Sequence, residues 1–96
     1  MTEPAVLREV NGHKGRYVIR HDSGDAEMTY SITSPTLVIA DHTAVPDSFR
    51  GTGAGLAMLS QFVADARAEG FTISPLCPFV EAMRLKHPEW ADAFAV

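Results

Sequence analysis

Glycine alternates with small residues in one short segment of the chain, Arg50-Gly51-Thr52-Gly53-Ala54-Gly55. The segment lies between an apolar run, Thr36–Ala40, and residues with helical spacing, so it is expected to lead into a helix. The first N–H groups of a helix have no partner within it, and the helix dipole adds partial positive charge, so this position suits an anion. Glycine permits close approach and positive φ. The segment therefore predicts a phosphate-binding loop, with Arg50 contacting phosphate oxygens.

The spacing of the glycines argues against two common nucleotide-binding motifs. A P-loop needs a lysine followed by Ser or Thr after its last glycine, whereas Leu56 and Ala57 follow Gly55. A dinucleotide-binding loop needs two residues between its second and third glycines, and a chain of 96 residues has no room for the doubly wound sheet. The pattern that remains is Arg50-x-x-Gly53-x-Gly55.

Composition narrows the class of protein further. The 96 residues are 46% hydrophobic and 21% charged, which is ordinary for one globular domain spanning residues 1–96. Eight Lys and Arg against 12 Asp and Glu give a net charge of −4. The basic residues are scattered, so we expect no nucleic acid as a partner. The apolar runs are far shorter than the roughly 20 residues that span a bilayer, so we expect no membrane segment.

The N-terminus and the cysteine count predict a cytoplasmic protein. Met1–Pro4 contains no basic region followed by an apolar segment, so no secretory signal is expected. The single cysteine, Cys77, cannot form an internal disulfide and fits a reducing compartment. Four histidines without a metal-ligand spacing predict no metal site.

Periodicity predicts the elements that position these residues. Strands are expected near Val6–Val10 and over Arg16–His21, Ala26–Thr33, Thr36–Ala40 and Phe71–Ser74, with helices over Leu56–Gly70 and from Pro78 to Pro88. The stripe of the first helix is expected to contain Leu56, Leu59, Val63 and Ala66. Thr36–Ala40 is apolar at every position after Thr36, which predicts a strand covered on both faces. Trp90 and Phe94 are expected on a last helical turn.

The order of these elements predicts an α+β fold. Mostly antiparallel strands come first, and a strand, a helix and a strand then form a βαβ unit. A right-handed crossover makes the two strands of that unit parallel. A short C-terminal helix follows.

The glycine segment also resembles a known family. Pro46–Leu56 resembles the acetyl-coenzyme A signature of the GNAT superfamily of N-acetyltransferases. Three further segments, Asp41–Val45, Pro75–Phe79 and His87–Glu89, resemble the branch of very short, single-domain members with a PLCPFV-type cysteine segment. The order and spacing of these segments agree with those of the family from Arg16 to Trp90.

The resemblance implies a binding mode for acetyl-CoA, the expected co-substrate. Two splayed parallel strands, Thr36–Val45 and Phe71–Cys77, would hold the coenzyme between them, and its pantetheine arm would pair with the first. Coenzyme binding is thereby assigned to Val45, Arg50, Gly51, Thr52, Gly53, Ala54 and Gly55. The helices that build the acceptor pocket in larger members are missing here, so we expect an open acceptor site. Phe79 stands where larger members often have a tyrosine that protonates the departing thiolate of coenzyme A.

Two residues are candidates for the chemistry of acetyl transfer, and each has a second interpretation. Cys77 precedes a helix start that favours a thiolate, so it could accept the acetyl group covalently. Alternatively, it is a small buried apolar residue. His42 could act as the general base toward an ammonium acceptor, or its ring could merely cap backbone or touch the coenzyme.

The function predicted from the sequence is acetyl transfer from acetyl-CoA to a primary amine, either a small molecule or a protein lysine. The alternative is a non-catalytic module that senses acyl-CoA or serves in interactions. A third interpretation makes the glycine segment a tight turn in a structural protein.

Overall fold

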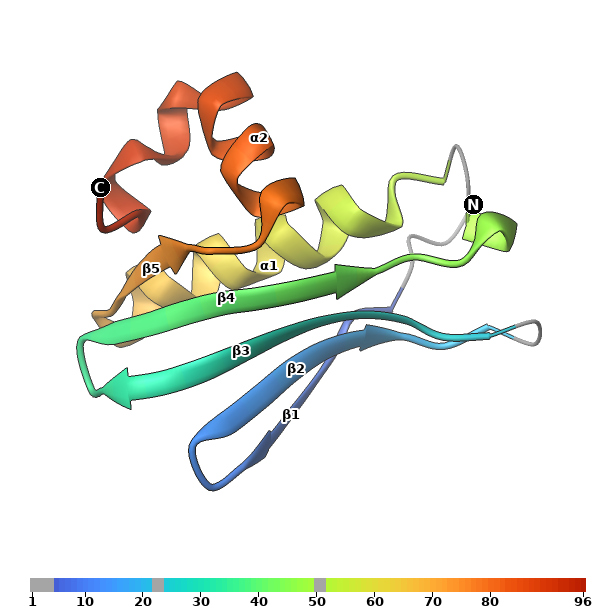
Figure 1. Ribbon diagram of the computed structural model, residues 1–96, viewed down its shortest axis with the longest axis horizontal. Helices are drawn as coiled ribbons and strands as arrows, with labels where there is room; N and C mark the ends of the chain where they lie inside the picture. Colours follow the sequence, from blue (N-terminus) through green and yellow to red (C-terminus); the bar gives the residue numbers. More distant parts are fainter. Residues whose placement is uncertain (1–4, 22–23, 50–51) are drawn as a thin grey trace.

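The computed structural model describes residues 5–21, 24–49 and 52–96 of the chain. In this part of the chain one sheet has the strand order β1-β2-β3-β4-β5 (Figure 1). The strands are β1 (Leu7–Asn11), β2 (Lys14–Ile19), β3 (Ala26–Ser34), β4 (Leu37–Ala44) and β5 (Thr72–Pro75). The helices are η1 (Asp47–Phe49), α1 (Ala54–Glu69), α2 (Pro78–Lys86) and η2 (Pro88–Ala93), η1 and η2 being 3-10 helices. Neighbouring strands are antiparallel except β4 and β5, which are parallel, so the predicted α+β mixed sheet is confirmed.

The first hairpin extends the sheet by one more strand at its edge. β1 pairs with β2 from Leu7↔Val18 to Asn11↔Lys14, and Gly12 makes the turn with φ +63°. Positive φ is natural for glycine, which explains the sharp reversal. β2 begins at Lys14, two residues before the predicted start, because the pairing with β1 continues to the turn.

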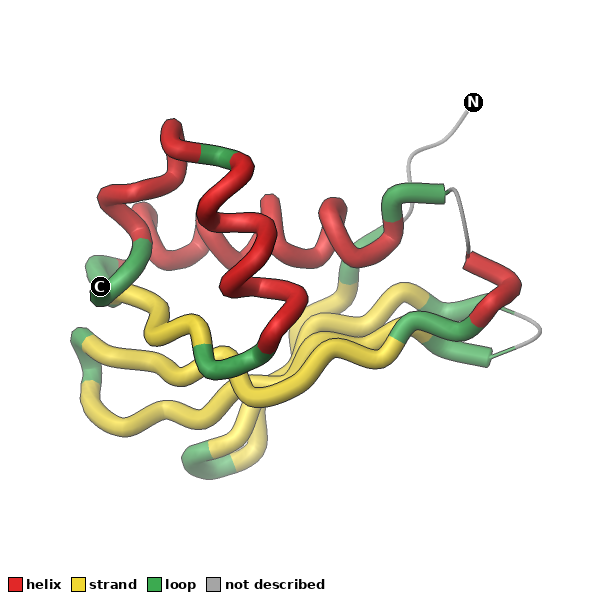
Figure 2. Tube along the Cα trace, turned by 45° about the horizontal axis from the view of Figure 1, so that its top comes forward, coloured by secondary structure: helices red, strands yellow, loops and turns green. Residues whose placement is uncertain are grey.

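The core lies between the sheet and α1. Figure 2 shows the helices gathered on one side of the strands. Tyr17 on β2, Tyr30 on β3 and Phe62 on α1 are fully buried, and their ring centroids lie 5.0 to 5.5 Å apart. Aromatic contacts at these distances add to the stabilisation from apolar burial. The core therefore ties α1 to the middle of the sheet.

The helical stripe of α1 differs from the predicted one at its start. The buried side chains are Met58, Leu59, Phe62, Val63 and Ala66, whereas Leu56 is 39% exposed. The inclusion of Leu56 was wrong because the helix starts at Ala54 and Leu56 lies on its outer side. Gly70 ends the helix in a left-handed conformation, as the sequence predicted.

The face of the sheet away from α1, here called the outer face, is open. In β4, Val38 and Ala40 are buried, whereas Leu37 and Ile39 remain partly exposed. The prediction that this strand is covered on both faces was wrong, since none of the described helices lies over the outer face (Figure 2). Within the sheet, β4 lies between β3 and β5.

The C-terminal segment packs on the β5 side of the molecule. Pro78 occupies the first turn of α2, and the helix ends at Lys86 before Pro88. Phe94 is buried but lies beyond η2, in extended backbone that bridges to Ile73. The prediction that it shares a helical turn with Trp90 was therefore wrong, because Ala95 N–H donates to Ile73 O and draws this segment toward β5.

Candidate functional site

The parallel strands β4 and β5 separate after only four residue pairs. Pairing runs from Leu37↔Thr72 to Ala40↔Pro75, and β4 then continues to Ala44. Beyond Pro75, the N–H of Cys77 still donates to Ala40 O at 2.9 Å. Within the described residues, Asp41–Ala44 have no strand partner on this side. The separation leaves a backbone edge that an extended ligand could pair with.

A β-bulge in β4 decides which side chains face the helices. Tyr30 pairs with Ala40, but Thr29 pairs with His42, so Asp41 is an extra residue on β4. An extra residue reverses the alternation of the strand. Thr43, which pairs with the buried Met28, therefore faces the helix side. His42 consequently faces the outer side.

Cys77 lies at the junction between β5 and α2. It is the N-cap residue of α2, it is 2% exposed, and it belongs to the main apolar core. Its Sγ lies 3.2 Å from Oγ1 of Thr43. This burial agrees with the interpretation of Cys77 as a core residue, while its polar contact and its place at the strand separation agree with a role in chemistry.

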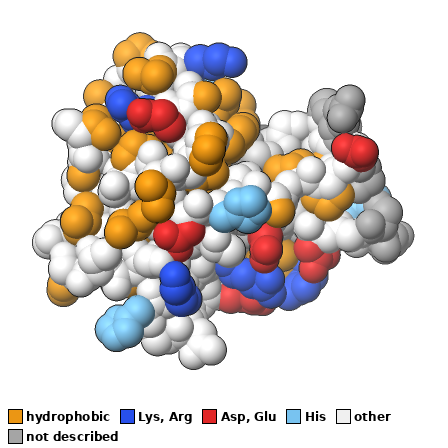
Figure 3. All heavy atoms as spheres, viewed as in Figure 1, with side chains coloured by type: hydrophobic (Ala, Val, Ile, Leu, Met, Phe, Trp, Pro, Cys, Tyr) orange, Lys and Arg blue, Asp and Glu red, His pale blue; other side chains and the backbone are white. Residues whose placement is uncertain are grey.

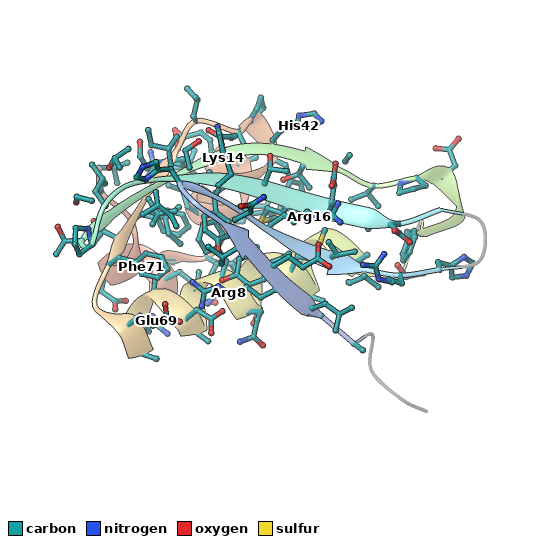
Figure 4. All side chains as sticks on the ribbon, turned by 90° about the horizontal axis from the view of Figure 1, so that it is seen from below. Arg8, Lys14, Arg16, His42, Glu69 and Phe71 are labelled. Atoms are coloured by element: carbon teal, nitrogen blue, oxygen red, sulfur yellow. The ribbon has the colours of Figure 1, made fainter. Side chains whose placement is uncertain are left out.

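His42 is exposed and is not brought together with Cys77. Figure 4 shows its ring pointing away from the ribbon at the β4 side of the sheet, whereas Arg8 and Glu69 lie together beside α1. A row of cross-strand neighbours on the outer face runs from Glu9 through Arg16 and Thr29 to His42. An acceptor that approaches the open face could therefore contact His42.

A hollow of about 440 Å³ lies on the outer face over β1, β2 and β3. Its lining comprises Glu9, Val10, Asn11, Lys14, Gly15, Arg16 and Thr29. Arg16 forms ion pairs with Glu9 at 2.7 Å and with Glu27 at 2.9 Å. Hydrogen bonds from Arg16 lower the pKa of Glu9, which keeps that carboxylate charged. Figure 3 shows acidic and basic side chains side by side in the lower part of the view, with hydrophobic ones gathered over α2 and the C-terminal segment.

The glycine segment begins α1, but only part of it is described. Arg50 and Gly51, two of the predicted coenzyme ligands, lie outside the described residues. The N–H and the hydroxyl of Thr52 both donate to Phe49 O, at 3.0 and 2.6 Å. Gly53 precedes the helix with φ +76°, which confirms the predicted left-handed glycine. The N-cap residue Gly53 makes no side-chain cap, and the N–H groups of the first turn have no partner within a helix.

The structure describes the other three predicted ligands. Ala54 and Gly55 are buried in the first turn of α1, and Val45 follows β4 with 41% of its surface exposed. A Cβ atom at position 55 would lie only 2.8 Å from Cζ of Phe79. A side chain at position 55 would therefore force the Phe79 ring to shift. This reason differs from the predicted one, which was close approach to a phosphate.

The described residues were compared with the requirements of a metal site and of a membrane-spanning helix. Among them, no three His, Cys, Asp or Glu side chains form a group that could hold a metal ion. None of the described helices combines the length and the apolar character needed to cross a bilayer.

Comparison with known proteins decides the family. The sequence profile of the GCN5-related N-acetyltransferases matches residues 16–93. The chain belongs to this family. It is also similar to the solution structure of a GCN5-like candidate N-acetyltransferase from Staphylococcus aureus, with 27% sequence identity and a TM-score of 0.74. That match covers 99% of this chain and 91% of the other. No curated protein matches the chain significantly.

Membership in the GCN5-related N-acetyltransferase family confirms the resemblance seen in Pro46–Leu56. The family and the fold support an acyltransferase. The narrower resemblance, to a short branch with the Cys77 segment, stays a prediction.

The sequence did not predict the role of Thr43 or the contact that Phe79 makes. Thr43 lies in a segment that the resemblance included, but strand alternation alone would place it on the outer face. Only the bulge at Asp41, which has no sequence signal that we could identify, turns it toward Cys77. Phe79 was noted as a substitution, yet its contact with Gly55 joins elements far apart in the sequence.

Proposed function

We propose that this protein transfers the acetyl group of acetyl-CoA to a primary amine. The observation that carries the proposal is the unpaired edge of β4, Asp41–Ala44, left where β5 ends in a chain of the GCN5-related N-acetyltransferase family. An extended arm that contains amide groups can pair with such an edge as an added strand would. The same end of the molecule presents the first turn of α1, which suits a phosphate group.

The residues present fit this co-substrate. Val45 and the edge of β4 would contact the pantetheine arm, and the segment from Thr52 to Gly55 would contact the pyrophosphate. Arg50 and Gly51, which precede that segment in the sequence, are included in the proposal. The positive end of the α1 dipole and the N–H groups of its first turn would stabilise the negative phosphates.

We further propose that Cys77 carries the acetyl group between the two substrates. The Cys77 sulfur attacks the thioester carbonyl, a new Sγ–C bond forms, and the bond from the carbonyl to the coenzyme sulfur breaks. The proton that Cys77 loses ends on the released coenzyme thiol. The amine then attacks the acetyl-cysteine, an N–C bond forms, and the Sγ–C bond breaks to regenerate the thiol.

His42 is placed for a different task in this scheme. Because it is exposed on the outer face, it can remove the proton from an ammonium group that arrives from that side. The acetyl group would pass from the helix side to the outer side through the region beyond Pro75, where β4 and β5 no longer pair. Cys77 and His42 would therefore act on opposite sides of the same strand.

The acceptor is proposed to be a small primary amine or the side chain of a protein lysine. None of the described helices covers the outer face, so it can admit either (Figure 2). The net charge of −4 favours a cationic acceptor through long-range attraction.

A second candidate function is an acyl-CoA sensor without catalysis. The burial of Cys77 and its separation from His42 favour this alternative, as does an aromatic ring without a hydroxyl at Phe79. Both functions require the same coenzyme site. They differ in whether an amine is consumed.

The two candidates are separated by an amine panel. Purified protein is first titrated with coenzyme A while its thermal unfolding is recorded, since a ligand that binds the folded state raises the midpoint. Release of coenzyme A thiol is then measured with polyamines, free lysine and lysine peptides. Turnover with at least one amine supports the enzyme, and stabilisation without turnover supports the sensor. The absence of any stabilisation would contradict both.

A further inference from the structure

We infer that Thr43 is a positioning residue for Cys77: its hydroxyl holds the sulfur at the separation of β4 and β5, directed for attack. The inference rests on the proposed covalent route through Cys77. The observation behind it is the distance of 3.2 Å between Thr43 Oγ1 and Cys77 Sγ, which joins two residues 34 positions apart.

The contact depends on the bulge in β4. Because Asp41 is an extra residue in the pairing with β3, Thr43 takes the helix-facing side of the strand. Without the bulge, strand alternation would place the Thr43 side chain on the outer face and turn His42 inward. The backbone irregularity therefore places a hydroxyl, rather than an imidazole, against the buried sulfur.

The backbone of Cys77 is held by two hydrogen bonds, one at its N–H and one at its carbonyl. The N–H of Cys77 donates to Ala40 O at 2.9 Å, which holds the residue against β4. Its carbonyl accepts from the N–H of Glu81 at 3.0 Å, which fixes it as the N-cap of α2. With the backbone held at both groups, the hydroxyl of Thr43 can set the direction of the sulfur.

The direction of the hydrogen bond changes with the state of the sulfur. A thiol can donate to Oγ1 or accept from it, but a thiolate can only accept, so the hydroxyl must then be the donor. A sulfur that is 2% exposed has little water to replace this hydrogen bond, so the hydroxyl remains its partner during the attack. The Thr43 side chain would thus hold the sulfur, while the backbone of the same strand edge is the part proposed to pair with the pantetheine arm.

Two variants at position 43 test the inference. Thr43→Val keeps the branched shape and removes the hydroxyl, whereas Thr43→Ser keeps the hydroxyl. Each variant receives acetyl-CoA, and acetyl incorporation is followed by intact mass. In parallel, each reacts with methyl methanethiosulfonate, a small reagent that does not need the coenzyme site. The chain has one cysteine, so the reagent reports Cys77 alone, and hydroxylamine, which cleaves a thioester but leaves an amide intact, identifies the acetyl groups carried on its sulfur.

We expect Thr43→Val to slow both reactions about tenfold, equivalent to about 1.4 kcal/mol, and Thr43→Ser to react within about twofold of the wild type. Urea unfolding of each variant corrects for any change in local opening. Thr33→Val, on the exposed part of β3, is the matched control and should leave both rates unchanged.

The outcomes separate this inference from the proposed function. Wild-type rates for Thr43→Val in both reactions, or a Thr43→Ser protein as slow as Thr43→Val, would overturn the inference. A wild-type protein that takes up no acetyl would overturn the covalent route. If Thr43→Val then still slowed the reagent and Thr43→Ser restored its rate, the role of Thr43 in holding the sulfur would stand.

Discussion

The ring of Phe79 occupies the space that any side chain at position 55 would need. The Cβ of an alanine there would lie 2.8 Å from Cζ and 3.2 Å from Cε2 of the ring. Gly55 lies in the first turn of α1 and Phe79 in the first turn of α2, so this contact sets how closely the two helix starts approach. The start that we propose to bind phosphate is thereby held next to the start that carries Cys77.

Replacing Gly55 with alanine should destabilise the fold by about 1–3 kcal/mol, the usual cost of forcing extra volume into a packed contact. Urea unfolding measures the loss. Phe79→Leu is the matching change, because it removes ring atoms from the contact. The double variant should lose less stability than the two single variants together. Strict additivity would show that the two residues do not interact as described.

The positive φ of Gly53 predicts a different kind of loss. Open space surrounds its Cβ position, so Gly53→Ala should cost about 1–2 kcal/mol through backbone strain alone. Gly12, with φ +63° and equally open space, is a matched control in the first hairpin. Both substitutions should reduce stability to a similar degree, but only Gly53→Ala should weaken the binding of coenzyme A. Equal binding by the two variants would argue against a coenzyme site at α1.

The sequence predicted the elements well because their signals are local. The alternation in Ala26–Thr33, the glycine at Gly70 and the proline at Pro78 each determine structure within a few residues. The parallel pairing of β4 and β5 also followed, because the handedness of the crossover constrains it.

The parts that could not be predicted depend on contacts between distant segments. The apolar run before Ala40 indicated burial on both faces, but whether a helix covers the outer face is decided by the rest of the chain. The bulge at Asp41 depends on how β3 and β4 pair, and it alone decides which of His42 and Thr43 faces the core. The residues Cys77 and His42 could therefore be named from sequence, while their separation could not.

Arg8 is expected to hold the edge strand β1 to α1. Its Nε donates to the Tyr30 hydroxyl at 2.9 Å, and its guanidinium forms an ion pair with Glu69. The hydrogen bond with Glu69 raises the pKa of Arg8, and the side chain is only 28% exposed. Arg8→Met should cost about 1–3 kcal/mol in urea unfolding, because it leaves partly buried groups without their partner. Arg20→Met, at a more exposed ion pair, should cost less than about 0.5 kcal/mol.

Tyr17 should make the protein sensitive to alkaline pH. Burial, reinforced by the hydrogen bond to Asp65 at 2.7 Å, raises the pKa of the Tyr17 phenol well above its ordinary value of 10.0. The neutral phenol therefore contributes stability that is complete below about pH 10 and is lost as the pH rises further, because the unfolded chain releases its proton first. Tyr17→Phe should be less stable at pH 8 by about 1 kcal/mol, but should lose less stability between pH 9 and pH 11. If the wild type and Tyr17→Phe lost the same stability between pH 9 and pH 11, the role of the Tyr17 phenol in alkaline sensitivity would be contradicted.

His42 provides the sharpest test of catalysis from the outer face. If it removes the proton of the incoming ammonium group, His42→Gln should lower turnover about 10²- to 10⁴-fold. Binding of coenzyme A and acetylation of Cys77 should remain close to wild type, because the ring lies on the opposite side of β4 from the sulfur. His13→Gln, in the exposed turn between β1 and β2, is the matched control and should change none of the three. As the pH rises, more of the acceptor is already the free amine and needs no general base. The loss of turnover in His42→Gln should therefore become smaller as the pH increases. A defect that stays constant with pH would instead place His42 in acceptor binding.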